Sequence, residues 1–287
     1  MKQVLEAFRR VLGVPLLIPE VDRLRREVAE LRKLVEREFI NCDDRDRDAL
    51  ILLCGLLRLQ SPNVRLETEH PVAIQSDDHR FPRGTRNDNT RHPRFVRACE
   101  MALGKPLWHL DLGCAGGGLV WDFVIAGNNS FGIEGSDLSL RDQRAEWRNI
   151  PQRLFTADIT KPFRLYDTDG RTNRFDVITA WEVLEHIPQD MLPGFFQNVT
   201  THLRSGGLFV ASIATFEDRD PATGAVWHVT LKPREWWAER LEECGLTRED
   251  GLFSDADFVR GSGNTRSLGD WDVRTNPNLG FHVVYRR

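Results

Sequence analysis

Near the middle of the chain, a short apolar segment runs directly into a cluster of glycines. The segment LWHLDL (residues 107–112) precedes the cluster GCAGGG (113–118), and a helical pattern then continues through Phe123. Glycine lets the backbone turn tightly and approach a ligand closely, and the start of a helix offers free N–H groups to that ligand. The pattern predicts a strand, a ligand-binding turn and a helix, although packing alone or a dinucleotide site would give a similar cluster.

Acidic residues end the next two apolar segments. SFGIE ends in Glu134, and RLFTAD ends in Asp158, which Ile159 follows. In Rossmann-like folds, an acidic side chain at the end of the second strand binds the two hydroxyls of a ribose. Glu134 therefore indicates a nucleoside at this edge of the sheet, the alternative being a surface carboxylate at a strand end.

Two further segments continue the alternation of strands and helices. FDVITAWEVLEHIP (175–188) has the pattern of a buried strand that runs into a helix. LRSGGLFVASI (203–213) has that of a helix end, stopped by Gly206 and Gly207, and then a strand. Alternating strands and helices are typical of α/β proteins with a parallel sheet. We therefore predict an α/β domain over residues 105–287.

Together these segments resemble the class I S-adenosylmethionine-dependent methyltransferases, in the branch that acts on small molecules and sugars. DLGCAGG (111–117) is similar to the D-x-G-x-G-x-G loop of that family, FGIE to the acidic end of its second strand and TADI to its adenine-contacting segment. FDVITAWEVLEHI, the Gly-Gly strand and HVTLKPREWWAERLEECGL (228–246) resemble the segments that follow. The resemblance implies a Rossmann-like, mostly parallel seven-stranded sheet with helices on both faces. It disfavours a dehydrogenase, because TADI and EVLEHI have no counterpart there.

The resemblance also implies that the cofactor is S-adenosyl-L-methionine, and it assigns roles to single residues. Asp111 would hydrogen-bond the amino group of the methionine part, and Glu134 would bind the ribose hydroxyls. Asp158 and the amide of Ile159 would contact the adenine, while Trp181 would face the sulfonium. The backbone beneath the cofactor would come from Gly113, Cys114, Ala115, Gly116 and Gly117. Ala115 departs from the family's usual glycine, and alanine adopts a left-handed conformation only at a cost, so the geometry of this turn is open.

A hydroxyl that accepts a methyl group must lose its proton. The base should lie on the loops at the carboxyl ends of the strands, where His186, Glu185 and His228 are the candidates. His228 falls between the fifth strand and the next helix, ahead of Trp236 and Trp237, which could line the pocket. Our hypothesis is that His228 is the general base, with His186 as the second catalytic candidate. Either histidine could instead be structural, since EHI occurs in the family whatever the acceptor.

Residues 61–104 form an arginine-rich loop or lid region ahead of the predicted domain. Its arginines suit a phosphate or carboxylate on the acceptor, or they pair with the acidic surface elsewhere. The segment SDDH could contact a polyol or hold a metal, and we assign no metal ligands. The candidate acceptor contacts are Asp78, His79, Arg91 and Trp236. The arginines of this region are Arg80, Arg83, Arg86, Arg91, Arg94 and Arg97.

Residues 1–60 read as a helical N-terminal segment. Within 20–38, apolar residues alternate at spacings of three and four with charges nearly everywhere else, which is a coiled-coil pattern. It indicates a homo-oligomer, and the alternative is an amphipathic helix that packs on its own domain. A strongly apolar helix is expected over 49–59.

Composition narrows the functional classes. The net charge is −4, which does not favour nucleic acid or anionic membranes as partners. The five cysteines never occur as C-x-x-C, and neither a signal peptide nor a membrane span is evident, so we expect a cytoplasmic protein. The sequence thus predicts methylation of an oxygen on a small-molecule or sugar acceptor, and that acceptor could carry a phosphate. An RNA methyltransferase and a catalytically silent scaffold of the same fold are the alternatives.

Overall fold

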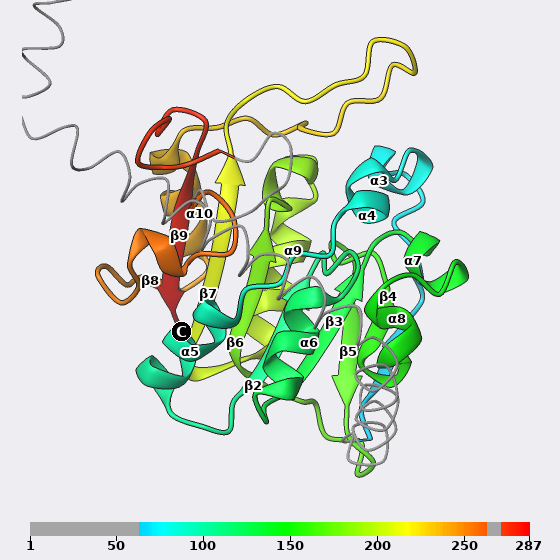
Figure 1. The fold of residues 1–287 in the computed structure, drawn as a ribbon, viewed down its shortest axis with the longest axis vertical. Coiled ribbons are helices and arrows are strands. Elements are labelled where there is room, and N and C mark those ends of the chain that lie inside the picture. The colour runs from blue at the N-terminus through cyan, green and yellow to red at the C-terminus, as the bar shows by residue number, and fades with distance from the viewer. Residues whose placement is uncertain (1–62, 263–270) are drawn as a thin grey trace, which may run out of the picture. The chain divides into compact units, whose positions relative to one another are not determined.

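The computed structural model describes residues 63–262 and 271–287, all within one compact unit. The helices expected over 20–38 and 49–59, and the self-association assigned to residues 1–60, lie outside the described residues. Seven strands form the main sheet in the order β4-β3-β2-β6-β7-β9-β8 (Figure 1). In chain order they are β2 (Trp108–Leu112), β3 (Asn129–Glu134), β4 (Leu154–Thr156), β6 (Phe175–Trp181), β7 (Leu203–Ala214), β8 (Thr247–Arg248) and β9 (Gly280–Arg286).

The sheet is parallel from β4 to β7, and β9 runs antiparallel to both of its neighbours. Strand order reverses between β2 and β6, because the chain builds outward first toward β4 and then toward β7. In open α/β sheets the carboxyl ends of the strands at such a reversal form the ligand crevice. The predicted Rossmann-like, mostly parallel seven-stranded sheet is confirmed.

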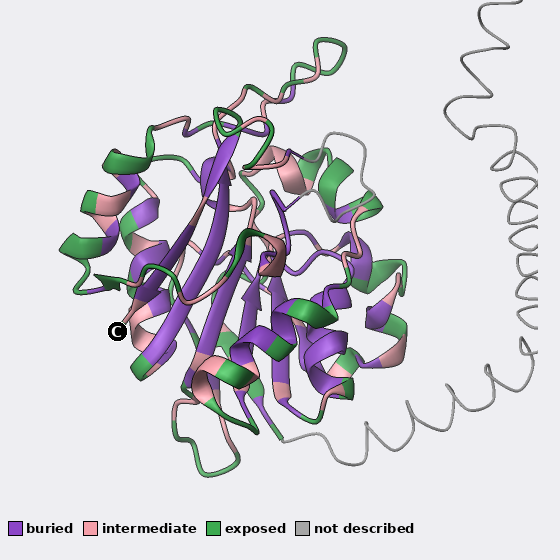
Figure 2. Cartoon of the chain, turned by 60° about the vertical axis from the view of Figure 1, so that its left-hand side comes forward, coloured by how far each residue is buried: buried purple, intermediate pink, exposed green. Residues whose placement is uncertain are grey.

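Helices cover both faces of the sheet, as Figure 1 shows. Successive residues of a strand point to opposite faces, so Val177 packs with one layer and Ile178 with the other. This is why the central strands are apolar without alternation, and Figure 2 shows them buried along almost their whole length. One face carries α5 (Pro93–Leu103) and α6 (Gly118–Ile125), and the other carries α9 (Leu192–His202) and α10 (Arg234–Glu243).

Two predicted boundaries are wrong. The helix before β7 ends at His202, and Gly206 and Gly207 lie inside the strand instead of at the helix end. Gly206 has a φ of 78°, and the pairing of β6 with β7 shifts register here, so the glycines accommodate an irregularity in the strand. His186 does not lie in a helix that continues from β6. It ends the short 3₁₀ turn η2 (Leu184–His186), and α9 begins only after it.

Residues 63–104 pack onto the sheet domain. Strand β1 (Arg65–Thr68) pairs with β5 (Phe163–Tyr166), and the chain then crosses the carboxyl ends of the main strands. There Ala73 N–H donates to Gly135 O, and Asp158 N–H donates to His70 O. The short helices are α3 (Asp77–Arg80), α4 (Arg83–Asn87), α7 (Leu138–Arg141), α8 (Glu146–Asn149), η1 (Pro151–Arg153) and η3 (Asp255–Asp257). Within the described ranges, no helix has the length and apolar character needed to cross a membrane.

Candidate active site

A cavity of about 820 Å³ opens at the carboxyl ends of the strands. Its floor includes Gly113 and Ala115 after β2, Glu134 at the end of β3, Asp158 after β4 and Trp181 at the end of β6. Residues from α3 and α4 and from the segment after β7 cover it. The predicted site residues from four strand ends are therefore brought together.

The glycine loop keeps a tight turn despite its alanine. Ala115 has a φ of 44°, in the left-handed region, between Gly113 at 79° and Gly117 at 84°. Such a conformation costs an alanine about 1–2 kcal/mol. Two buried hydrogen bonds hold it: Ala115 N–H donates to Glu134 Oε2 over 2.7 Å, and Trp147 Nε1–H donates to Ala115 O over 2.8 Å. The open question about this turn is thus resolved in favour of the left-handed conformation.

Asp111 lies beneath the loop at the end of a buried chain of hydrogen bonds. Thr179 Oγ1 donates to Asp111 Oδ1 over 2.6 Å, and His109 Nε2 lies 2.9 Å from the same hydroxyl. His109 Nδ1 in turn lies 2.8 Å from Ser130 Oγ. Burial raises the pKa of Asp111 to about 7, while it lowers that of His109 to about 3. These hydrogen bonds link β3, β2 and β6, and they fix the direction in which the Asp111 carboxylate points.

Glu134 joins the loop to the covering helices. Its Oε2 accepts from Ala115, and its Oε1 lies 3.2 Å from both Ser136 N and Thr85 Oγ1. Burial raises the pKa of this carboxyl, which the hydrogen bonds from Ser136 and Ala115 oppose. Because a carboxylate offers about four acceptor positions, two further donors could bind if Thr85 moved away.

The remaining predicted cofactor residues differ in position. Asp158 and Ile159 line the cavity, as does Trp181, whose buried Nε1–H has no hydrogen-bond partner among the described residues. Asp111, Cys114, Gly116 and Gly117 do not line it. The Cys114 side chain faces β3 beneath the loop, while Gly116 and Gly117 lie against covering or neighbouring side chains, with no room for a Cβ.

At the other end of the cavity, two histidines lie side by side. The imidazole rings of His186 and His228 are 4.8 Å apart. His186 Nδ1 lies 2.9 Å from Asp78 Oδ2, and His228 Nδ1 lies 2.6 Å from Phe216 O. Each histidine therefore uses Nδ1 for an oxygen acceptor, and Nε2 is left with no such partner in the described part of the chain.

Glu185 lies directly behind the histidines and is fully buried. Its Oε1 accepts from Ala214 N–H over 2.9 Å, while Oε2 is buried without a partner among the described residues. Burial raises the pKa of Glu185 to about 8. Burial alone would lower the pKa of His186, but Asp78 beside it raises that pKa to about 9, whereas burial and the neighbouring His186 lower the pKa of His228.

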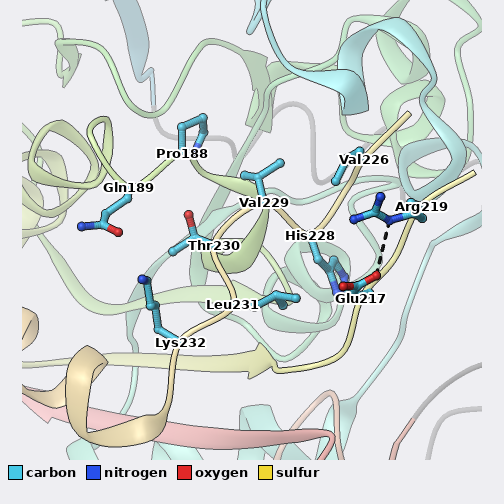
Figure 3. A pocket seen from close by; sticks show the side chains of 10 residues that line it. All are labelled: Pro188, Gln189, Glu217, Arg219, Val226, His228, Val229, Thr230, Leu231 and Lys232. Atoms are coloured by element: carbon cyan, nitrogen blue, oxygen red, sulfur yellow. Dashed lines mark ion pairs between the residues drawn. The ribbon is translucent and has the colours of Figure 1, made fainter. Parts of the chain in front are cut away.

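A second cavity of about 560 Å³ adjoins the first at His228, which lines both. Figure 3 shows its wall, in which Gln189, Glu217, Arg219 and Lys232 supply polar groups around His228. The ion pair between Arg219 and Glu217 spans 3.4 Å. His228 thus stands where a polar outer cavity meets the cavity above the strand ends, and His186 lines the latter beside it.

Most of the other predicted acceptor contacts lie elsewhere. His79 lines the main cavity, but Arg91 instead pairs with Asp122 over 2.6 Å, and Trp236 packs against Trp237 in α10, away from both cavities. Of the six arginines, only Arg83 lines the main cavity. Four of the six pair with carboxylates, namely Arg80, Arg83, Arg91 and Arg94. The sequence left open whether these arginines pair with acidic groups, and the four arginines just named do so.

The model of the methyltransferase domain family matches residues 78–252, which is more than half of the chain. The chain belongs to this family. It is a methyltransferase of the S-adenosylmethionine-dependent class, and S-adenosyl-L-methionine is its cofactor. No curated protein sequence matches this methyltransferase significantly.

Solved structures similar to this methyltransferase share few of its residues. A TehB-like S-adenosylmethionine-dependent methyltransferase from Corynebacterium glutamicum is 16% identical, with 72% of this chain and 94% of that chain covered and a TM-score of 0.46. An amino pentose methyltransferase from Micromonospora echinaspora is 15% identical, with 71% and 94% covered and a TM-score of 0.47. A 1,6-didemethyltoxoflavin-N1-methyltransferase from Burkholderia thailandensis is 16% identical, with 73% and 84% covered and a TM-score of 0.46.

The residues present fit the cofactor of this methyltransferase. The cavity has the size of a ligand site, and the carboxylates of Glu134 at the end of β3 and Asp158 after β4 line it, while Asp111 of β2 lies buried beneath the glycine loop. Trp181 also lines the cavity, and its buried indole N–H has no hydrogen-bond partner among the described residues. When bound, the cofactor supplies an activated methyl group, so the protein must align the acceptor and manage its proton.

Proposed function

We propose that this methyltransferase transfers the methyl group to a hydroxyl of a small-molecule or sugar acceptor. The paired histidines carry this proposal. His186 and His228 each hold an oxygen through Nδ1, and both line the main cavity, with His228 also lining the outer one. An amine acceptor with a free lone pair needs no base, whereas a hydroxyl must lose its proton. His228 is buried and its pKa is lowered, so it can accept that proton, and this favours a hydroxyl.

The cofactor residues are proposed on their positions at the strand ends. Asp111 would bind the amino group of the methionine part, and Glu134 would bind the ribose hydroxyls in place of Thr85. Asp158 and Ile159 would contact the adenine, and Trp181 would lie toward the sulfonium. The supporting observation is that the last four line one cavity above the carboxyl ends of parallel strands.

The outer cavity supports a polar acceptor. Its wall offers carboxylate, amide, hydroxyl and ammonium groups, from Glu217, Gln189, Thr230 and Lys232. Such a mixture suits an acceptor with several hydroxyls, as in a sugar. Lys232 and Arg219 add positive charge for a phosphate or carboxylate on that acceptor.

Labelled methyl transfer onto a panel of nucleotide sugars, glycans, phenols, amines and RNA tests this proposal. We expect label on hydroxyl oxygens of small molecules. His228→Asn should lower turnover by about 10²–10⁴-fold and leave cofactor affinity unchanged. The matched control is His70→Asn, because His70 is exposed and lines neither cavity. Label found only on nitrogen or only on RNA would refute the assignment.

A further inference from the structure

We infer that Glu185, His186 and His228 bind a divalent transition-metal ion. One carboxylate oxygen of Glu185 and one ring nitrogen of each histidine lie within 4.8 Å of one another. Two ligands of one tetrahedral ion, each about 2.1 Å from it, lie about 3.4 Å apart. The three side chains thus need to close by about 1.4 Å at most around an ion.

The state of Glu185 is the second observation that points to a cation. Its carboxyl group is fully buried, and Oε2 has no hydrogen-bond donor anywhere in the described residues. A buried, unpartnered carboxylate oxygen is costly unless something positive reaches it. One ring nitrogen of each histidine lies within 4.8 Å of a Glu185 carboxylate oxygen, and imidazole nitrogens and carboxylates together are common ligands of metal ions.

The outer hydrogen bonds of both histidines match those of metal ligands. Metal-bound histidines almost always donate their other ring N–H to a carboxylate or a backbone carbonyl. Here Asp78 Oδ2 accepts from His186 Nδ1, and Phe216 O accepts from His228 Nδ1. Both acceptors hold a proton on Nδ1, so Nε2 is the nitrogen that would bind the ion, and a proton on Nε2 of His186 would leave when the ion binds. The two acceptors come from distant segments of the chain.

The donor set indicates the class of ion. Imidazole favours Zn²⁺, Co²⁺, Fe²⁺ and similar ions, whereas Mg²⁺ and Ca²⁺ prefer all-oxygen sites. Two histidines and one glutamate also leave at least one coordination position open, as in catalytic zinc sites. That position would face the cavity junction, where both histidines line the wall.

This inference deepens the proposed function and rests on it for its consequence. The ion would bind the acceptor hydroxyl and lower its pKa, so that the proton passes to solvent water. The oxygen then forms its bond to the methyl carbon, and the carbon–sulfur bond breaks with its electron pair remaining on sulfur. His228 would act here as a ligand, not as the free base that the sequence predicted.

Calorimetric titration of the chelator-treated full chain with Co²⁺, Mn²⁺ and Mg²⁺ tests the site. We expect one Co²⁺ or Mn²⁺ per chain, weak Mg²⁺ binding, and a visible absorption band on Co²⁺ binding. Glu185→Gln keeps the acceptor for Ala214 N–H and should weaken Co²⁺ binding about 100-fold or more. Asp78→Asn, which perturbs the outer hydrogen bond of His186, should weaken it about 10–100-fold. The control Glu239→Gln makes the same change at an exposed position of α10 that lines neither cavity and should leave Co²⁺ binding unchanged.

Cofactor affinity is measured on every variant, and its retention shows that the fold is intact. Should Glu185→Gln not fold, His228→Asn with retained cofactor binding takes its place. A wild-type chain that binds no stoichiometric Co²⁺ or Mn²⁺, or a Glu185→Gln variant that binds as tightly, overturns the metal site. Hydroxyl methylation without bound metal would refute this inference alone, whereas methylation only of nitrogen would refute the proposed function alone.

Discussion

Replacement of Thr179 by valine tests whether the buried hydrogen-bond chain organises the site. Thr179 is fully buried, and valine has nearly the same shape, so the change leaves no cavity. Above pH 7 the Asp111 carboxylate is ionised and accepts from Thr179 Oγ1. The same hydroxyl must then accept from His109 Nε2–H. The threonine hydroxyl thus serves two buried groups at once.

The size of the effect follows from those two bonds. A hydrogen bond to a charged group contributes about 1.5–3 kcal/mol, and an unsatisfied buried donor costs about 1–3 kcal/mol. Allowing for about 1 kcal/mol regained by the extra buried methyl, Thr179→Val should lower the free energy of unfolding by about 1.5–5 kcal/mol. Cofactor affinity should fall about tenfold, because Asp111 loses its orienting partner.

Urea unfolding at pH 8 measures the loss, with Thr179→Ser as the matched control. Serine keeps the hydroxyl and removes only a methyl, so it should cost about 1 kcal/mol. A valine variant that is as stable as the serine variant would show that the hydroxyl is not needed. Such a result would show that the buried series of hydrogen bonds from Ser130 to Asp111 does not organise the site.

Two further outcomes concern the cofactor end of the cavity. Glu134→Ala should weaken cofactor binding by about 1.5–3 kcal/mol in a calorimetric titration, since charge-assisted hydrogen bonds to the ribose are lost. Asp169→Ala, at an exposed position, serves as the control. Equal cofactor affinities for the two variants would refute the ribose assignment. Burial raises the pKa of Asp111 to about 7, so its neutral form prevails below that pH, whereas a cationic cofactor requires the ionised form. The dissociation constant should therefore rise about tenfold for each pH unit below about 7 and level off above it, and a flat profile from pH 5 to pH 8 would contradict this role.

The cofactor end of the site was readable from the sequence because its residues follow strands directly. Glu134 and Asp158 occur at the ends of apolar segments, and parallel strands bring such ends to one edge. Local pattern therefore carries most of the information. Ala115 marks the limit of this reading, since its left-handed conformation depends on Trp147 and Glu134, which are distant in sequence.

The acceptor end depends on contacts that no local pattern contains. Asp78 lies before the first strand of the sheet and His186 after the fourth, and only the crossing of residues 70–92 over the strand ends brings them together. His109 and Thr179 lie inside apolar strands, where no motif marks them as part of a site. A histidine within LWHLDL was the available signal, because a buried polar side chain needs partners on neighbouring strands. The placement of Trp236 away from the cavities likewise reflects how α10 packs on the sheet.

The segment of α3 and α4 contacts both ends of the main cavity at once. Asp78 holds His186 at the acceptor end, and Thr85, one short helix further on, holds Glu134 at the cofactor end. A ribose that displaced Thr85 would therefore loosen or shift the residue that orients His186. Binding at the two ends would then be coupled, because a cofactor that shifts Thr85 would change the affinity for the acceptor, and the acceptor would change the affinity for the cofactor by the same factor.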